Sequence, residues 1–328
     1  MGGMEKPMFK GKRILVPLDG SEMAEAALPA AAYLSDRLNA AVTLFHVIER
    51  DAPVEVHGQR HLRAPKEAEA YLEEISERLA REAERAPKAG EKTVDIHVHA
   101  AQAEDVAASI ARHALEMGCG LIVMCSHGRG RALHLLLGSI AQKVIAGGDI
   151  PVLIIRPEPG GAAPAFSCRT LLLPLDGNPE HEQALPAAGE LAEACGSVLH
   201  IAVAVPEFES LSGQGALTSR FLPGTMSQVL EMSVEDAEKY LRERLLEITG
   251  LGLDARAHVL RGDPATAMDG LARSVKAGLI VMATHAKRQA MDAFWDGNVP
   301  HKISSLSRVP LLLVPVKAKL SEGERCGC

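Results

Sequence analysis

Glycines, a serine and an arginine are concentrated in one short stretch of the sequence. Gly128, Gly130 and Gly138 leave the backbone accessible, and Ser139 follows directly after the last of them. Backbone amides exposed at glycines and in the first turn of a helix attract anions, helped by the helix dipole. Arg129 adds positive charge. This combination of residues predicts a site that binds phosphate groups.

The elements around this stretch indicate how it is positioned. The run LIVM at residues 121–124 is typical of a buried parallel strand, and an amphipathic helix pattern begins at Ser139. A strand, a glycine loop and a helix N-terminus together form a common phosphate-binding arrangement. Neither GxxxxGK[ST] nor GxGxxG occurs in the chain, so we expect an arrangement different from those two motifs.

Strand and helix patterns alternate along the chain. In the first half, strand patterns begin at residues 13, 41, 93, 121 and 150. Helix patterns between them cover residues 24–38, 65–85 and 105–117. The alternation predicts an α/β fold in which each half is a five-stranded parallel sheet with helices on both faces. We expect the strand order 3-2-1-4-5 in each half. Ligands bind such sheets at the carboxyl ends of the strands, where we expect Asp19, Val47 and the glycine stretch.

The sequence is internally duplicated. ILVPLDG, which contains Asp19, corresponds to LLLPLDG, which contains Asp176, at an offset of 157 residues. The two LIVM runs and the two strands that begin with proline follow at nearly the same offset, which indicates two copies of one domain. We therefore expect domains at 1–158 and 169–318, a linker at 159–168 and a C-terminal tail at 319–328.

Composition narrows the class of protein. The formal net charge of −7 argues against nucleic acid as the main partner. No apolar run approaches the roughly 18 residues that a membrane-spanning helix needs, and the N-terminus lacks an apolar signal segment. We therefore expect a cytoplasmic protein without membrane insertion. The six cysteines show no disulfide framework.

The motifs ILVPLDGSE, HVI and LIVMCSHG, and a GS pair before an apolar helix, resemble the universal stress protein family. The likeness covers both halves, so the chain looks like a tandem member with Rossmann-like, adenine nucleotide alpha hydrolase-like domains. Nucleotide-binding members of this family carry the spacing G-x2-G-x9-G-[ST], used on the ribose and phosphates of ATP. Gly128 and Gly138-Ser139 satisfy most of it, and Cys125 replaces its first glycine.

Carried over by position, the resemblance implies that Asp19 and Val47 contact adenine, with help from the backbone of Pro17. It places Cys125 beside the ribose. Around the phosphates, with Mg²⁺, it places Gly128, Arg129, Gly130, Gly138, Ser139 and Ile140. A side chain at position 125 crowds the sugar, but cysteine is small, so we expect reduced affinity and not exclusion.

The second half departs further from the motif. Its corresponding loop reads MATHA at residues 282–286 and lacks both early glycines, and one residue is inserted before Gly297. Asp292 and Asp296 bring negative charge towards the phosphate position, which disfavours a polyanion. We expect this half to bind ATP weakly or not at all and to serve as a structural partner.

The resemblance implies a cytoplasmic, ATP-binding stress-response protein that acts as a nucleotide-sensing regulator on an unidentified protein partner. No residue is an evident general base for attack on the γ-phosphate, so any hydrolysis is expected to be slow. The family's last strands pair between domains, so the halves should form a pseudo-dimer, with further homodimerisation left open. The alternative is an interaction module that binds no nucleotide.

A third interpretation rests on four histidines. His57 and His61 follow the second strand pattern, and His97 and His99 lie in the third, which should be its neighbour. Imidazoles that gather near one sheet edge bind Zn²⁺. A polar loop over a half-exposed edge strand explains the same residues more simply.

Overall fold

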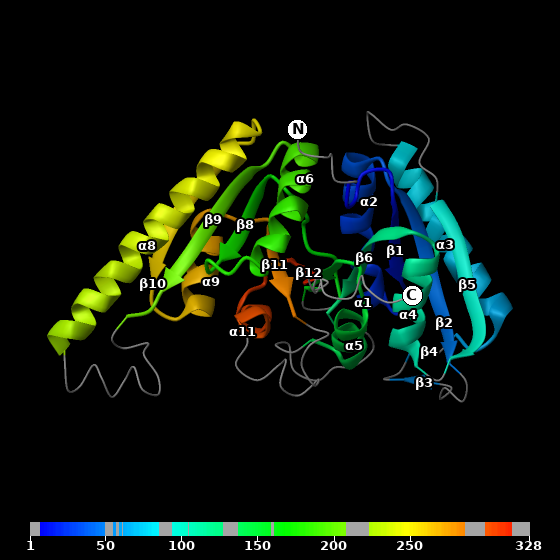
Figure 1. The fold of residues 1–328 in the computed structure, drawn as a ribbon. Coiled ribbons are helices and arrows are strands. Elements are labelled where there is room, and N and C mark those ends of the chain that lie inside the picture. Colours follow the sequence, from blue (N-terminus) through cyan, green and yellow to red (C-terminus); the bar gives the residue numbers. More distant parts are fainter. Residues whose placement is uncertain are drawn as a thin grey trace, which may run out of the picture.

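A single sheet runs through the whole molecule (Figure 1). The structure is a computed structural model that describes residues 7–49, 55–56, 59–60, 62–84, 94–103, 105–126, 137–158, 161–207, 223–285 and 299–316. Ten strands are hydrogen-bonded in the order β10-β9-β8-β11-β12-β7-β6-β1-β2-β5. Each half therefore has the predicted order 3-2-1-4-5.

The strands of the first half are β1 (Arg13–Pro17), β2 (Ala41–Glu49), β5 (Val94–Ala103), β6 (Cys119–Cys125) and β7 (Val152–Ile155). Those of the second half are β8 (Thr170–Leu175), β9 (Val198–Val205), β10 (Ala255–Arg261), β11 (Leu279–Thr284) and β12 (Leu311–Pro315). A separate two-stranded sheet consists of β3 (Glu55–Val56) and β4 (Gln59–Arg60). The pairs within each half of the large sheet are parallel.

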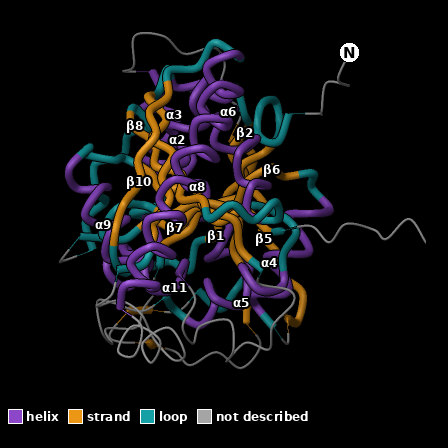
Figure 2. Tube along the Cα trace, turned by 60° about the vertical axis from the view of Figure 1, so that its left-hand side comes forward, coloured by secondary structure: helices purple, strands orange, loops and turns teal. Residues whose placement is uncertain are grey.

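The helices of the first half are α1 (Glu22–Glu25), α2 (Leu28–Leu38), α3 (Pro65–Glu84), α4 (Val106–Glu116) and α5 (Ser139–Gly147). Those of the second half are the 3₁₀ helix η1 (His181–Ala184), α6 (Leu185–Cys195), α8 (Pro223–Gly250), α9 (Pro264–Ser274) and α11 (Val299–Leu306). They lie on both sides of the strands (Figure 2).

The two halves meet through their last strands. β7 and β12 pair antiparallel, with Val152, Leu153 and Ile154 opposite Leu313, Leu312 and Leu311. All the residues of both strands are buried. The expected pairing of the last strands is confirmed, and it turns two five-stranded sheets into one.

Strand periodicity divides the buried residues between the two faces of this sheet. In β6, Leu121, Val123 and Cys125 belong to the core on the side of α1, α2 and α3, whereas Ile122 and Met124 belong to the core beneath α4 and α5. Alternation is what the pleat of a strand requires. Both cores include side chains from both halves.

The helix expected over residues 24–38 is interrupted in the structure. α1 ends at Glu25, and α2 begins at Leu28 with Pro29 in its first turn. Proline has no N–H to donate to Glu25, and its ring clashes with that carbonyl in a continuous helix. Pro186, at the same offset of 157, separates η1 from α6 in the second half.

Other elements add detail to the expected pattern. The β3–β4 pair lies between β2 and α3. The strand pattern that begins at residue 93 corresponds to β5, which extends to Ala103. The limits predicted for the domains, linker and tail stay predictions.

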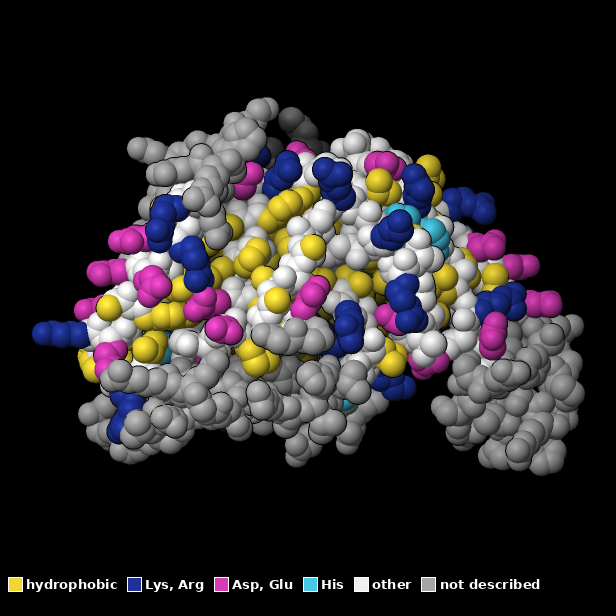
Figure 3. All heavy atoms as spheres, turned by 180° about the vertical axis from the view of Figure 1, so that it is seen from behind, with side chains coloured by type: hydrophobic (Ala, Val, Ile, Leu, Met, Phe, Trp, Pro, Cys, Tyr) yellow, Lys and Arg dark blue, Asp and Glu magenta, His cyan; other side chains and the backbone are white. Residues whose placement is uncertain are grey.

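The surface carries charges of both signs. On the face shown in Figure 3, basic and acidic side chains are interspersed, with apolar side chains visible between them. None of the helices in the described ranges combines the length and the apolar character that crossing a membrane would need.

Candidate functional site

The loop after β1 is held in place by its own aspartate. Asp19 Oδ1 accepts hydrogen bonds from the Ser21 backbone N–H at 2.9 Å and from Ser21 Oγ–H at 2.6 Å. Ser21 Oγ in turn accepts a bond from the Ala24 N–H at 3.2 Å, as an N-cap of α1. Asp19 therefore has the turn-forming role that its position after a strand suggests, and its carboxylate lies at the carboxyl end of β1.

The carboxyl end of β6 lies against the start of α5. The Ser126 N–H donates to the Ile155 carbonyl at 2.8 Å, and the Ser126 carbonyl accepts from the Gly138 N–H at 2.6 Å. Ser126 and Gly138 are thereby held together. The first turn of α5 consequently lies at the end of β6, which neighbours β1 at the point where the strand order reverses.

The N-cap residue of α5 contributes no side-chain hydrogen bond. Gly138 is its N-cap residue, with φ −62° and ψ 152°, and makes no side-chain hydrogen bond. Ser139 is exposed, and Ile140 is 37% exposed although it is apolar. An uncapped helix start offers N–H groups and the positive end of the helix dipole to an anion.

The Cys125 side chain lies on the α1 side of the sheet. It is 7% exposed, and its Sγ–H donates to the Ala24 carbonyl at 3.6 Å. Burial, followed by the charge of Asp19, raises the pKa of this thiol well above its ordinary range. The thiol is therefore protonated and packed under α1.

Pro17 and Val47 occupy neighbouring strands. Pro17 ends β1 beside Phe45, and Val47 lies two residues further along β2. The Val47 side chain is buried in the core on the side of α4 and α5. The Leu18 N–H donates to the Phe45 carbonyl at 2.8 Å, so the β1 and β2 backbones stay paired up to the Asp19 turn.

Several predicted site residues are described only in part or lie outside the described residues. Gly128, Arg129 and Gly130 lie outside the described residues, as do His57 and His61. Of the remaining predicted zinc ligands only the backbone is described, and it pairs His97 with Phe45 and His99 with Val47. Across the described ranges, no three His, Cys, Asp or Glu side chains are grouped to hold a metal ion.

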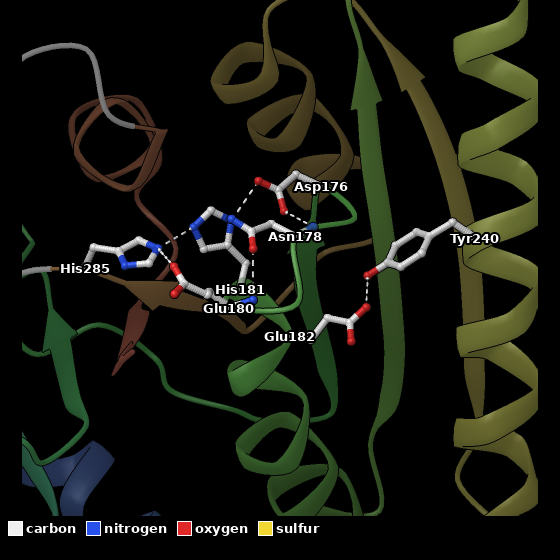
Figure 4. A network of polar contacts seen from close by, with 7 residues as sticks. All are labelled: Asp176, Asn178, Glu180, His181, Glu182, Tyr240 and His285. Atoms are coloured by element: carbon white, nitrogen blue, oxygen red, sulfur yellow. Dashed lines mark hydrogen bonds and ion pairs between the residues drawn. The ribbon is translucent and has the colours of Figure 1, made fainter. Parts of the chain in front are cut away.

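In the second half, the corresponding position contains a polar network (Figure 4). Asp176 Oδ2 bonds to His181 Nδ1 at 2.7 Å, and His181 Nε2 lies 2.9 Å from His285 Nε2. Glu180 Oε2 is 3.6 Å from the same His285 nitrogen. His181 stands where the first half has Ala24, at the same offset of 157 residues, so an imidazole ring replaces a methyl group at this position.

Electrostatics favour an ion pair inside this network. The hydrogen bond that His181 donates to Asp176 raises the pKa of His181 above its ordinary value, although burial opposes the shift. Burial acts to raise the pKa of Asp176, but the bonds from His181 and the Asn178 N–H outweigh it and lower that pKa. At pH values below the raised pKa of His181, its protonated ring therefore forms an ion pair with the Asp176 carboxylate.

A clasp of Glu, Tyr and Arg recurs in both halves and was not predicted. Glu25 accepts from Tyr71 O–H at 3.1 Å and from Arg78 at 2.5 Å, which ties α1 to α3. In the second half, Glu182 accepts from Tyr240 O–H at 2.8 Å and from Arg244 at 3.4 Å.

The sequence does contain a signal for this clasp. Glu25 and Glu182 have the same offset of 157 residues as the aspartates, and two of the three tyrosines in the chain are Tyr71 and Tyr240. The clasp positions the short helix that follows each Asp-bearing turn, so its effect on the site is indirect.

Comparison with protein families gives two matches. A model described as the universal stress protein family matches residues 11–156 and again residues 168–315. Universal stress protein YxiE of Bacillus subtilis is 34% identical over 149 residues, which cover 44% of this chain and 98% of the relative. Universal stress protein MJ0577 of Methanocaldococcus jannaschii is 31% identical over 159 residues, which cover 44% of this chain and 94% of the relative.

One solved structure shares the fold across nearly the whole chain. A universal stress protein from Archaeoglobus fulgidus superimposes with a TM-score of 0.65 at 18% identity, covering 94% of this chain and 98% of that chain. A universal stress protein solved in complex with cAMP covers 47% of this chain and 100% of its own, at 23% identity and a TM-score of 0.33.

Proposed function

The chain belongs to the universal stress protein family in both of its halves and is thus a stress-response protein; from that premise we propose that its first half binds ATP with Mg²⁺. In this proposal the protein is a cytoplasmic regulator that changes its interaction with a protein partner according to the nucleotide bound. The second half supplies the other side of the shared sheet and binds no ATP.

One observation carries the proposal. The Gly138 N–H is bonded to the Ser126 carbonyl at 2.6 Å, which holds the uncapped start of α5 at the end of β6. A bound phosphate group would accept hydrogen bonds from the first-turn amides of α5 and from the Ser139 hydroxyl. Gly128, Arg129 and Gly130 would complete the phosphate side from the adjoining segment.

The adenine end of the proposed site lies at β1 and β2. Asp19 already uses Oδ1 to hold the turn through Ser21, which fixes the orientation of its carboxylate. In this proposal the Asp19 carboxylate and the Val47 backbone contact the adenine ring, and the Pro17 backbone lies beside them. Ile140, which is exposed in the first turn of α5, would lie against the ligand.

The position of Cys125 supports this arrangement. Its thiol points towards Ala24 under α1, on the face of the sheet opposite Met124. The substitution of the motif's first glycine therefore places a side chain in the core and leaves the backbone of residue 125 to face the ribose.

Two histidines distinguish the second half from the site proposed in the first. His181 replaces Ala24 and bonds to Asp176 at 2.7 Å, so the carboxylate that corresponds to Asp19 is already paired. His285, which follows β11, contacts the other nitrogen of this ring, His181 Nε2. A nucleotide would have to break these contacts before it could bind.

Calorimetric titration of the full chain with MgATP tests the proposal. We expect one binding site per chain, and none after Gly138→Val, because the valine side chain crowds the first-turn amides. Gly147→Val is the matched control: it lies at the other end of α5, where an added Cβ meets nothing within 4 Å. ADP and cAMP, the ligand of one solved family member, are titrated in parallel.

The alternative function remains an interaction module that works without nucleotide. Absence of heat with all three nucleotides would favour it and would overturn ATP binding. ATP turnover approaching about 1 s⁻¹ would instead contradict the assignment as a sensor, since typical kinases turn over at about 1–100 s⁻¹.

A further inference from the structure

Two cysteines meet at the junction between the halves, away from the proposed ATP site. Cys168 precedes β8, and Cys195 is the last residue of α6; both are unbridged and buried. The turn after α6 brings them together, because the Ser197 hydroxyl donates to the Cys168 carbonyl and the Val198 N–H donates to the Arg169 carbonyl at 2.9 Å. Each of the two thiols is the neighbour that most strongly shifts the pKa of the other.

Side chains from the first half complete this cluster. The Tyr33 hydroxyl of α2 is close enough to the Cys195 thiol to lower its pKa, and the Cys168 backbone lowers the pKa of Tyr33 in turn. The Arg37 guanidinium lies 5.5 Å from the centre of the Tyr33 ring, near both sulfurs. α2 and α6 lie side by side (Figure 1), so the cysteine pair is shared between the halves.

The two thiols differ in exposure and in electrostatics. Cys195 is 9% exposed and Cys168 is fully buried. The hydrogen bond from Cys168 lowers the pKa of Cys195, and Arg37 and Tyr33 add to this effect while burial opposes it. The pKa of Cys168 is raised by the same hydrogen bond and by burial. By contrast, burial raises the pKa of Cys119 to about 11.

We propose that Cys168 and Cys195 form an oxidative modification site at which a hydroperoxide produces a reversible disulfide. Cys195 is the attacking thiol, because it is the less buried of the two and a thiolate next to a second thiol is the arrangement that oxidants select. Cys168 is the resolving thiol. This inference does not depend on nucleotide binding.

The chemistry balances in two steps. The Cys195 thiolate attacks the peroxide, an S–O bond forms, the O–O bond breaks, and the departing alkoxide or hydroxide takes a proton from water. The Cys168 thiol then attacks the sulfur of the Cys195 sulfenic acid, and an S–S bond forms as water leaves. The protein loses two electrons and two protons, and the peroxide is reduced to an alcohol or water.

The test uses the full chain with Cys326→Ser and Cys328→Ser, so that thiols in the tail do not contribute. After treatment with a tenfold excess, about 100 µM, of hydrogen peroxide, non-reducing peptide mapping should recover the peptides of Cys168 and Cys195 linked together. Intact mass should fall by the two hydrogens of one disulfide, and dithiothreitol should restore it.

Single variants separate the two roles. Cys195→Ser should abolish the linked peptide, whereas Cys168→Ser should leave a sulfenic acid on Cys195 that dimedone traps. Cys119→Ser is the matched control, since it removes another buried thiol, and it should behave as the parent. Failure to find the linked peptide in the parent, or oxidation of Cys119 at the same rate, would overturn the proposal.

A second measurement keeps the test informative if a serine variant fails to fold. Arg37→Met leaves both thiols in place and removes the positive charge near them. Disulfide formation should then slow by at least about threefold, because the thiolate fraction of Cys195 falls. An unchanged rate would contradict the assignment of Cys195 as the attacking thiol.

Discussion

Asp19 and Asp176 occupy corresponding positions in the two halves but have different partners. Asp19 holds Ser21 at the start of α1, whereas Asp176 holds both the Asn178 N–H and the ring of His181. One substitution in the duplicated sequence, from alanine at position 24 to histidine at 181, therefore changes what the neighbouring carboxylate can do. The two copies therefore differ in the hydrogen-bond partners of corresponding aspartates.

Asp19→Asn should weaken MgATP binding by about tenfold, the loss of one hydrogen bond to a charged group. Asparagine keeps an oxygen that can accept from Ser21, so the turn should survive. Asp176→Asn is the matched control from the other copy, and it should leave the dissociation constant unchanged. Equal losses in both variants, measured by calorimetry, would mean that both halves bind.

The ion pair of the second half predicts a pH dependence of stability. The pKa of His181 is raised above its ordinary value of 6.5, so its contribution is present below pH 6.5 and is lost as the pH rises through the raised pKa. The pKa of Asp176 is lowered below its ordinary value of 3.8, so its contribution is lost only when the pH falls through that lowered value.

His181→Ala should therefore lower the free energy of unfolding more at pH 5.5 than at pH 9. The effect should be at most about 1 kcal/mol, because the Asp176 side chain is 54% exposed and its charge is screened by solvent. Urea denaturation at the two pH values measures it. His258→Ala should show the opposite trend, since burial and Arg256 lower the pKa of His258.

At the scale of elements, the duplicated features are the ones that shape the site. Pro29 and Pro186 end the short helix after each Asp-bearing turn, and Glu25 and Glu182 fasten that helix to a long one. The helix pattern in residues 65–85 predicted α3 correctly, because an apolar stripe repeated over several turns is typical of a helix that packs on a core. The helix break was missed, although Pro29 was a visible signal.

Tyr71→Phe should destabilise the first half by about 1 kcal/mol, because it removes the O–H donor to a partly buried carboxylate that keeps its bond to Arg78. Tyr240→Phe is the equivalent change in the second half and should have a similar effect through Glu182. Urea denaturation checks both. If neither variant shifts the midpoint, the clasp does not stabilise the fold.

Sequence periodicity predicted the parallel sheet but not the contacts between elements far apart in the chain. Parallel pairing followed from the β-α-β alternation, since parallel strands need crossover connections. The side of the sheet on which Cys125 points also follows from strand alternation, yet its contact with Ala24 depends on where α1 ends. The meeting of Cys168 with Cys195 depends on a turn that no local pattern specifies.

At the scale of the whole molecule, a carboxylate of the second half holds the N-terminal segment of the first. Glu190 of α6 accepts from the backbone N–H groups of Met8 at 2.7 Å, Phe9 at 2.9 Å and Lys10 at 2.6 Å. Phe9 is buried in the core on the side of α1 and α2. This contact, the β7–β12 pairing and the shared cores are independent links between the halves.

Glu190→Ala should speed hydrogen exchange at the amides of Phe9 and Lys10 by about tenfold or more, because hydrogen bonds to a charged group contribute about 1.5–3 kcal/mol. Exchange measured by mass spectrometry on N-terminal peptides reports the change. Glu193→Ala, at an exposed position of the same helix, is the control. Protection that is unaltered in Glu190→Ala would show that Phe9 packing alone anchors the segment.

The antiparallel junction of β7 with β12 has a consequence for how the two copies diverge. Each copy is permanently joined to one partner, so neither has to recognise a free copy of itself. Selection on the junction then acts on Leu153 and Leu312 together, while the loops at the strand ends change independently. A fused pair of this kind can keep one copy for ligand chemistry and let the other acquire features such as His181 without losing assembly.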